Sequence, residues 1–314
     1  MAGSLDATTE RERRVHVAVV GAGNVGSDLV CKLLAEPGPM ELVLVGDLDP
    51  RAAGLRLARD HGISTSDEGL AEAMDDPAIE IVFDATTAAA HRLHSVLLAA
   101  AGKVAIDLTP AAAGLGVVPP FSPAAYALEP NLSLVSCPAQ ATVPLVRAVS
   151  RTTPVLYAET VSTLASSSVG RATRQSIDEL TTASARALEE LGGAARGKSI
   201  AIVSPAEPPV TMRSSIFVVP HGDAPDETIA DAVHAAAEDV RRRVPGYSLV
   251  GFPAFEERAT PWGSRRCVRL LVEVRGAGDT LGPFAGNLDV TTCAARAVGT
   301  SVAKRLLAAR EVAA

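Results

Sequence analysis

A glycine-rich loop near the N-terminus constrains the fold of this chain more than any other segment. The apolar run Val15–Val20 leads into residues 21–26, which read GAGNVG, and a helical pattern follows. A second apolar run, Leu42–Val45, is followed by Asp47 and Asp49. These acids lie about 20 residues after the last glycine, where a dinucleotide-binding βαβ unit has its ribose-binding acid. This order predicts a parallel Rossmann-type sheet.

Each glycine of the loop has a physical reason in such a unit. Gly21 permits the tight turn, Gly23 lets the backbone approach a pyrophosphate, and Gly26 lets the helix pack closely on the strand. Asp47 or Asp49 would bind a ribose diol and repel a 2′-phosphate, which favours NAD over NADP, although the nearby Arg51 weakens that preference.

Two further apolar runs end in polar loops. Residues 81–83 lead into Asp84–Thr87, and residues 104–106 lead into Asp107–Pro110. Both runs are typical of buried parallel strands, and ligands bind at the carboxyl ends of such strands. His91 and His94 follow the first loop, and with no partner evident we expect surface or packing roles for them.

Cys137 lies where the apolar run Leu132–Val135 meets the helix-starting residues 138–142. A thiol at the positive end of a helix is expected to favour the thiolate. A nucleophile and a nucleotide site in one chain point to covalent hydride-transfer chemistry on a carbonyl. The other cysteines form no CxxC pair and have no His at metal-ligand spacing, so we expect packing roles and neither a disulfide framework nor a metal site; they are Cys31, Cys267 and Cys293.

The pattern changes after Cys137. We expect a strand at 155–164, a long helix at 173–191, and further strands and a helix up to about residue 274. The alanine-rich helix 286–314 is placed back against the first domain. The predicted fold is therefore α/β: a doubly wound parallel Rossmann-type domain at 1–136, completed by 286–314, and an α+β catalytic, substrate and dimerisation domain at 137–285.

Composition excludes several classes of protein. The net charge of −7 and the lack of long Lys or Arg runs argue against nucleic acid as a partner. The sequence has no apolar stretch long enough to span a membrane, and its polar residues 1–10 lack the apolar core of a secretion signal. We expect a cytoplasmic protein that does not interact with membranes.

Several ordered motifs together resemble the acylating acetaldehyde dehydrogenases, the NAD- and coenzyme A-dependent enzymes that accompany 4-hydroxy-2-oxovalerate aldolases in aromatic catabolism. The resemblance covers most of the first domain and continues in order through the second. The motifs that carry it include GAGNVGSDL at 21–29, VFDAT at 82–86, IDLTPAA at 106–112, QATVP at 140–144, PAEPP at 205–209 and AGNLD at 285–289.

The resemblance implies a mechanism in which Cys137 attacks a short aldehyde, hydride passes to NAD, and the Cys137 thioester is transferred to coenzyme A. It also implies an aldolase partner. Exposed apolar β surface expected in the second domain predicts a homodimer. Gln140 belongs to the catalytic motif. The expected cofactor-binding residues are Gly21, Gly23, Asn24, Val25, Gly26, Asp47, Asp49, Thr86 and Asn287.

The chain departs from the family pattern near the expected chemistry. Pro138 replaces a glycine beside the nucleophile and removes a backbone N–H that could bind an oxyanion. Ser214 stands where the family has an acidic residue taken to be its general base, and a serine cannot accept a proton near neutral pH without help. Glu207 is the nearest replacement base in the sequence.

Two alternatives use the same residues. A semialdehyde dehydrogenase or acyl-phosphate reductase would keep Cys137 but use phosphate in place of coenzyme A, with Arg171 and Arg174 available to bind it. A degenerate dehydrogenase would bind NAD and an aldolase without turnover, which Pro138 and Ser214 would explain.

Overall fold

The computed structural model describes residues 14–36, 38–119 and 124–313, so the polar N-terminal residues 1–10 lie outside it. The first domain is built on a seven-stranded sheet in the order β3-β2-β1-β4-β5-β7-β6, and all its neighbouring strands are parallel, as predicted. Its strands are β1 (Val15–Val20), β2 (Met40–Gly46), β3 (Ser64–Ser66), β4 (Ile79–Asp84), β5 (Val104–Asp107), β6 (Leu115–Gly116) and β7 (Asn131–Ser133).

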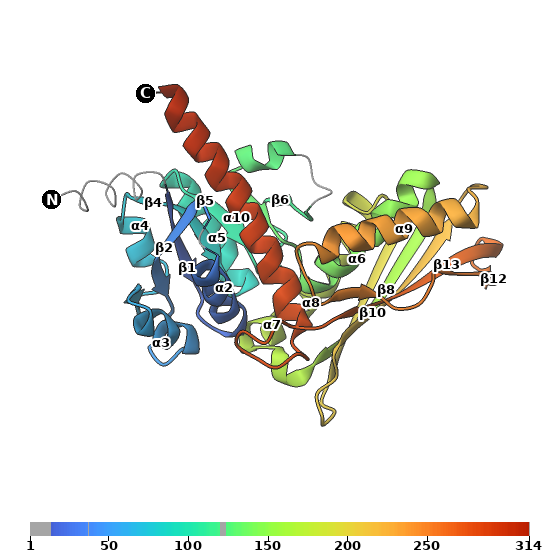
Figure 1. Ribbon diagram of the computed structural model, residues 1–314, viewed down its shortest axis with the longest axis horizontal. Helices are drawn as coiled ribbons and strands as arrows, with labels where there is room; N and C mark the ends of the chain where they lie inside the picture. The colour runs from blue at the N-terminus through green and yellow to red at the C-terminus, as the bar shows by residue number, and fades with distance from the viewer. Residues whose placement is uncertain (1–13, 37, 120–123, 314) are drawn as a thin grey trace.

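Helices cover both faces of this sheet, which is why its strands are almost continuously apolar (Figure 1). They are α2 (Asn24–Ala35), α3 (Ala53–Asp60), α4 (Ala71–Asp75) and α5 (Ala88–Ala100), with a 3₁₀ turn η1 at Ala124–Leu128.

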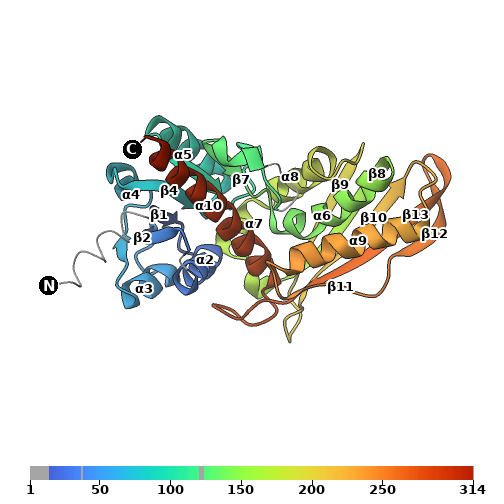
Figure 2. The ribbon, with the colours of Figure 1, turned by 45° about the horizontal axis from the view of Figure 1, so that its top comes forward.

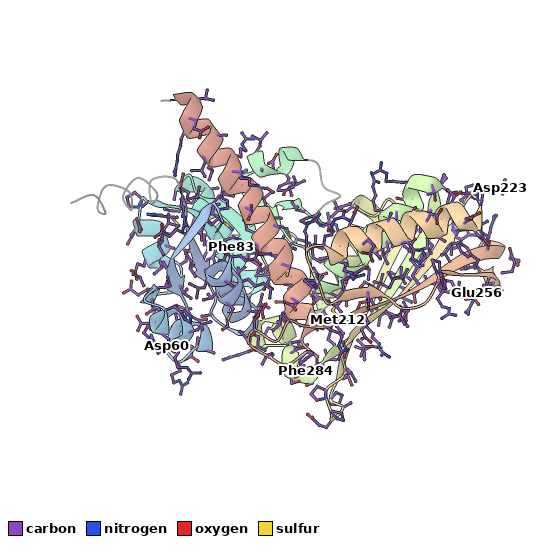
Figure 3. The ribbon with its side chains drawn as sticks, in the orientation of Figure 1. Asp60, Phe83, Met212, Asp223, Glu256 and Phe284 are labelled. Carbon is purple, nitrogen blue, oxygen red and sulfur yellow. The ribbon has the colours of Figure 1, made fainter. Side chains whose placement is uncertain are left out.

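The C-terminal helix α10 (Gly286–Ala313) returns to the first domain, as expected from the sequence (Figure 2). A Cβ atom on Gly299 would lie 2.5 Å from the ring of Phe83 on β4, so the glycine allows a close approach of helix and sheet. Figure 3 shows Phe83 within the first domain, beside this helix.

The second domain contains a mixed sheet in the order β11-β13-β10-β8-β9, with β12 paired to β13. The pairs β10–β8 and β10–β13 are antiparallel, whereas β8–β9 is parallel, so the sheet is not purely antiparallel. Its strands are β8 (Val155–Ala165), β9 (Gly197–Ser204), β10 (Met212–Pro220), β11 (Tyr247–Leu249), β12 (Ala254–Thr260) and β13 (Gly263–Val274).

The helices α6 (Cys137–Thr152), α8 (Ile177–Glu190) and α9 (Asp226–Arg241) cover one face of this sheet (Figure 1). The short helices η2 (Ser166–Ser168) and α7 (Arg171–Gln175) follow β8, and α7 reaches the first domain. The predicted single helix 173–191 is therefore wrong in one respect: it breaks at Ser176, which is buried and has a φ of −122° that does not fit a helix.

A buried ion cluster joins the two ends of the chain. Lys32 of α2 lies 3.1 Å from Asp28 and 2.6 Å from Asp279, and it also pairs with Asp289 of α10. The three carboxylates are close enough to suggest a metal site, but the Lys32 ammonium already provides a cation among them. Asp28 also accepts a hydrogen bond from Thr292 at 2.7 Å, so the cluster fastens α10 to α2.

We expect Lys32→Met to lower the free energy of unfolding by about 3 kcal/mol, because it leaves buried carboxylates without their cation. Urea denaturation measures this change. Lys304→Met, which alters an exposed lysine of α10, is the matched control and should change stability by less than about 0.5 kcal/mol. Equal effects of the two substitutions would show that the cluster does not stabilise the fold.

Candidate functional site

A cavity of about 770 Å³ lies at the carboxyl ends of the first-domain strands. Its wall includes the glycine loop, the loops after β2, β4 and β5, and residues 170–175 of the second domain. Apolar side chains line part of it, and Leu48, Leu93 and Leu97 are exposed there. The expected cofactor-binding residues that line the cavity are Gly21, Gly23, Asn24, Val25, Asp47, Asp49 and Thr86.

The glycines of the loop differ in the space around them. A Cβ atom on Gly26 would lie 1.8 Å from the Gly21 carbonyl oxygen, so Gly26 supports the cavity without lining it. A Cβ atom on Gly23 would meet nothing within 4 Å. Asp47 accepts hydrogen bonds from the Ala22 N–H at 2.5 Å and from the Asp49 N–H at 2.8 Å, so it also orders the loop itself.

Cys137 is the first residue of α6 and follows a strained turn. The predicted strand 132–135 ends earlier, at Ser133, because Val135 has a φ of 63°, in the left-handed region that β-branched residues rarely adopt. Such strain costs about 1–3 kcal/mol and is typical of functional sites. Ser136 caps the helix by accepting a hydrogen bond from the Ala139 N–H at 3.1 Å.

The side chain of Gln140 stabilises this turn by hydrogen bonds to the backbone. Its side-chain Nε2 donates to the carbonyl oxygens of Leu134 at 2.9 Å and Val117 at 2.7 Å, and the residue is buried. Gln140 therefore fixes the backbone that leads to Cys137, which is a positioning role.

The expectation of a thiolate at Cys137 is wrong for the protein without ligand. Burial raises the pKa of the Cys137 thiol to about 12, and its own backbone N–H only partly opposes this effect. The loss of hydration disfavours the charged form of the thiol. The thiol needs a further change in its surroundings to lose its proton near neutral pH.

Helix α6 places Cys137 over one end of the second sheet. The helix runs back along β8 and joins it through Thr153 and Pro154, and its length from Cys137 to Thr152 is about 22 Å. Tyr247 of β11 pairs with Val274 of β13, and Val274 pairs with Met212 at the start of β10, two residues before Ser214. The hydrogen bond from Tyr247 Oη to the Ala141 carbonyl, at 2.8 Å, fixes the first turns of α6 over this end.

Ser214 faces Ser162 at the same end of the sheet. Both side chains are buried, and their Oγ atoms are 2.8 Å apart. Ser214 lies two residues from the buried Met212 and two from the buried Ile216, and residues two apart on a strand point to the same face. Its hydroxyl therefore lies on the face that α6 covers. The sequence therefore identified Ser214 but not that a second hydroxyl pairs with it, because the pairing depends on the register of β8 and β10.

Asn287 also belongs to this region. A Cβ atom on its neighbour Gly286 would lie 1.9 Å from the Val274 carbonyl, and Val274 pairs with Met212 at the start of β10. Figure 3 shows Met212 beside the lower end of α10. Asn287 is buried, and its Oδ1 atom has no hydrogen-bond partner among the described residues. It does not line the 770 Å³ cavity.

Glu207 is exposed. It lies on the loop 205–211, which crosses from β9 to β10 past the end of β8. Figure 1 shows this yellow loop projecting beyond the sheet. An exposed carboxylate keeps its water, so Glu207 is a weaker candidate for a base than the sequence suggested.

The two histidines after β4 do have partners, contrary to the expectation from the sequence. His91 and His94 both approach Asp84 Oδ2 through their Nδ1 atoms, at 2.9 and 2.8 Å. The sequence shows an Asp at the end of a strand and a His seven residues later, which is compatible with such a contact. That both side chains are buried is known only from the fold.

Because its pKa is raised, we expect Cys137 in the protein without nucleotide to react slowly with iodoacetamide at pH 7. The rate should rise about tenfold per pH unit, without a plateau below pH 9, since the thiolate fraction follows pH below the pKa. Mass spectrometry of the alkylated peptide measures this rate. A plateau between pH 6 and 8 would contradict the raised pKa.

Comparison with known proteins agrees with these features. Residues 137–282 match the family model described as prokaryotic acetaldehyde dehydrogenase, dimerisation. An acetaldehyde dehydrogenase of Roseiflexus sp. (strain RS-1) is 50% identical over 96% of this chain and 99% of its own length. The acetaldehyde dehydrogenases of Chloroflexus aurantiacus (strain J-10-fl) and Thermus thermophilus are 52% and 51% identical over 95% and 94% of this chain, and 98% and 96% of their own lengths.

Within the described residues, no helix combines the length and the apolar character needed to cross a membrane. The match of residues 137–282 to a dimerisation domain supports a homodimer. High identity over nearly the whole length, with a Rossmann-type sheet and a mixed second sheet, identifies an oxidoreductase: the chain belongs to the acylating acetaldehyde dehydrogenase family.

Proposed function

We propose that this protein is an NAD-dependent, coenzyme A-acylating dehydrogenase of a short aldehyde such as acetaldehyde. The observation that carries the proposal is the position of Cys137 at the start of α6, on a strained turn. Tyr247 holds the first turns of this helix at the sheet end where Ser162 and Ser214 pair. The names of the relatives support the substrate class.

In this proposal, Cys137 Sγ attacks the aldehyde carbon and gives a thiohemiacetal. The thiol proton passes to solvent, directly or relayed through a neighbouring hydroxyl, and the former carbonyl oxygen takes up a proton. When bound, NAD supplies the hydride acceptor that converts the thiohemiacetal into a thioester, and coenzyme A supplies the thiol that accepts the acyl group. The backbone N–H of Cys137 is a donor for the developing oxyanion; Pro138 has none, and the Ala139 N–H is bonded to Ser136.

The hydroxyl pair Ser162–Ser214 would act as a proton relay and not as a base. Each hydroxyl can donate and accept at once, so the 2.8 Å contact can pass a proton without holding a charge. This pair replaces the carboxylate of the family pattern with two neutral groups. We expect a lower rate of the same reaction and not a change of reaction.

The residues present fit a bound NAD molecule. Gly23 leaves space for a pyrophosphate, and the exposed Leu48 and Leu93 offer an apolar surface for an adenine ring. Asn287 has an unpartnered Oδ1 that could accept a hydrogen bond from a carboxamide. Hydrogen bonds from Arg51 lower the pKa of Asp49, so this carboxylate is charged at the cavity wall and would repel a 2′-phosphate.

The surroundings of two arginines favour coenzyme A over phosphate as the acyl acceptor. Arg174 donates through Nε to the Val169 carbonyl at 3.1 Å and through Nη2 to the Ser166 carbonyl at 2.7 Å, which ties it to its own loop. Arg171 lies at the wall of the dinucleotide cavity. Both arginines therefore have positions that do not require an acyl phosphate beside Cys137.

The open face of the second sheet would form the homodimer, because the helices cover only the other face. Val161 and Phe217 are half-buried apolar residues on strands β8 and β10 of this sheet. A monomeric mass in sedimentation equilibrium would contradict the dimer. An aldolase that delivers the aldehyde belongs to the proposal through the family resemblance alone, and co-elution of the two purified proteins would test it.

The purified protein should form NADH from NAD, coenzyme A and acetaldehyde, and Cys137→Ala should lower the rate at least about a thousandfold, because no covalent intermediate can form. The release of NADH is followed by absorbance. Cys31→Ala, at a half-buried cysteine of α2, is the control and should keep full turnover.

The same assay tests whether Glu207 is the general base. Glu207→Gln should retain turnover, since this residue is exposed. Turnover that survives Cys137→Ala would rule out the covalent mechanism, and turnover that needs phosphate in place of coenzyme A would favour the acyl-phosphate alternative.

Two glycine substitutions separate cofactor binding from folding. Gly23→Ala should leave the thermal unfolding temperature unchanged but weaken NAD binding at least about tenfold, because its methyl group meets only the space meant for the ligand. Gly26→Ala should lower the unfolding temperature as well, since its Cβ would overlap the Gly21 carbonyl. Isothermal titration calorimetry and thermal denaturation measure the two effects. Equal NAD affinity in Gly23→Ala and the unaltered protein would place the pyrophosphate elsewhere.

A further inference from the structure

A buried cluster of charged groups lies behind the wall of the dinucleotide cavity. Asp84 ends β4, Asp107 ends β5, and His91 of α5 lies between them with a fully buried ring. None of these three residues lines the cavity or takes part in the proposed chemistry at Cys137.

Each carboxylate uses one oxygen for a cavity loop and the other for histidine. Asp84 Oδ1 accepts hydrogen bonds from the Thr86 N–H at 3.0 Å and the Thr86 hydroxyl at 2.5 Å. Asp107 Oδ1 accepts from the Thr109 N–H at 2.7 Å. Asp84 Oδ2 is 2.9 Å from His91 Nδ1, and Asp107 Oδ2 is 3.6 Å from His91 Nε2. Thr86 and Thr109 both line the cavity, so His91 lies directly behind two loops that would touch the ligand.

The hydrogen bonds around His91 require a proton on both ring nitrogens. Nδ1 faces Asp84, whose pKa is lowered by its hydrogen bonds to His91 and His94, although burial opposes this, so the carboxylate can only accept. Nε2 is 3.2 Å from Asn131 Oδ1, and the Nδ2 of the same amide donates to the Ala113 carbonyl at 3.1 Å. Since both neighbours are acceptors, the ring donates twice and is an imidazolium cation.

We infer that His91 is a cationic positioning residue that holds the loops 84–87 and 107–110 in the shape that the dinucleotide requires. This inference rests on the proposed NAD site. A neutral ring would leave either Asp84 or Asn131 facing a nitrogen lone pair. It would also leave the buried carboxylates of Asp84 and Asp107, which hold the two loops, without the cation between them.

The other groups around the ring agree with a positive charge. The titratable groups that face it are Asp84 from β4, Asp107 from β5 and His94 from α5, whereas Asn131 of β7 is uncharged. The pKa of His91 is raised because its carboxylate partners outweigh burial, and burial raises the pKa of Asp107 to about 7. The positive charge of His91 therefore offsets negative charge on Asp84 and Asp107, and this reduces the net charge that is buried here.

The first test reads the charge of the ring without any nucleotide. In protein labelled with ¹⁵N-histidine, the His91 ring should show the two similar nitrogen shifts of an imidazolium at pH 7.5. Asn131→Ser assigns the signal, because it alters the neighbour of Nε2. The unaltered protein gives the reading, so the test does not depend on a variant that fails to fold. One protonated and one bare nitrogen would overturn the inference.

The second test measures NAD binding by calorimetry in His91→Gln. The dissociation constant should rise roughly tenfold to a hundredfold, as for supporting groups behind a ligand contact. Affinity of the unaltered protein should fall as pH rises through the raised pKa of His91, and His91→Gln should lack this fall. The alkylation rate of Cys137 should not change, which separates positioning from general unfolding. His61→Gln, at an exposed histidine outside the cavity, is the matched control.

The stability of the protein should follow the same titration. A raised pKa means that the contribution of His91 to stability is complete below its unfolded value, near pH 6.5, and is lost as pH rises through the folded value. NAD binding that is equal in His91→Gln and the unaltered protein would overturn the inference and leave the proposed function intact. An imidazolium in a protein that binds no NAD would instead refute the proposed cofactor and leave the charge assignment standing.

Discussion

The backbone turn between β7 and α6 is the constraint on which the proposed chemistry depends. Val135 is held in a left-handed conformation, and the buried Gln140 amide ties the turn to Leu134 and Val117. This conformation stops the strand at Ser133 and starts the helix at Cys137. Because α6 then runs back along β8, the turn decides which part of the second sheet lies under the thiol.

The two domains meet where this site lies. The Lys32 cluster fastens the loop before α10 to the first domain, and Gly286 brings the first turn of α10 against Val274 of the second sheet. Asn287 is thereby placed at the junction with an open acceptor. A long helix that packs on both domains fixes their relation better than a flexible linker could, and hydride transfer needs such fixed geometry.

The cavity of the first domain and the surroundings of Cys137 differ in how they accommodate charged groups. Around the cavity, buried carboxylates at strand ends are paired with His91 and with backbone N–H groups, so the polar loops are rigid before a ligand arrives. Cys137 packs against the apolar core of the second domain, and burial raises the pKa of its thiol. The first arrangement favours binding, and in the proposed mechanism the second leaves Cys137 reactive only when its surroundings change.

The sequence by itself determined the parallel first sheet, the glycine loop with its acids, the return of α10 and the position of Cys137 in the chain, because these depend on local periodicity and on residues with special backbone freedom. Only the tertiary structure decided the break at Ser176, the pairing of Ser162 with Ser214, the exposure of Glu207 and the partners of His91. It also reversed the expected pKa shift of Cys137. Burial and strand register arise from contacts between distant segments, and both the pKa of a group and its partners depend on those contacts.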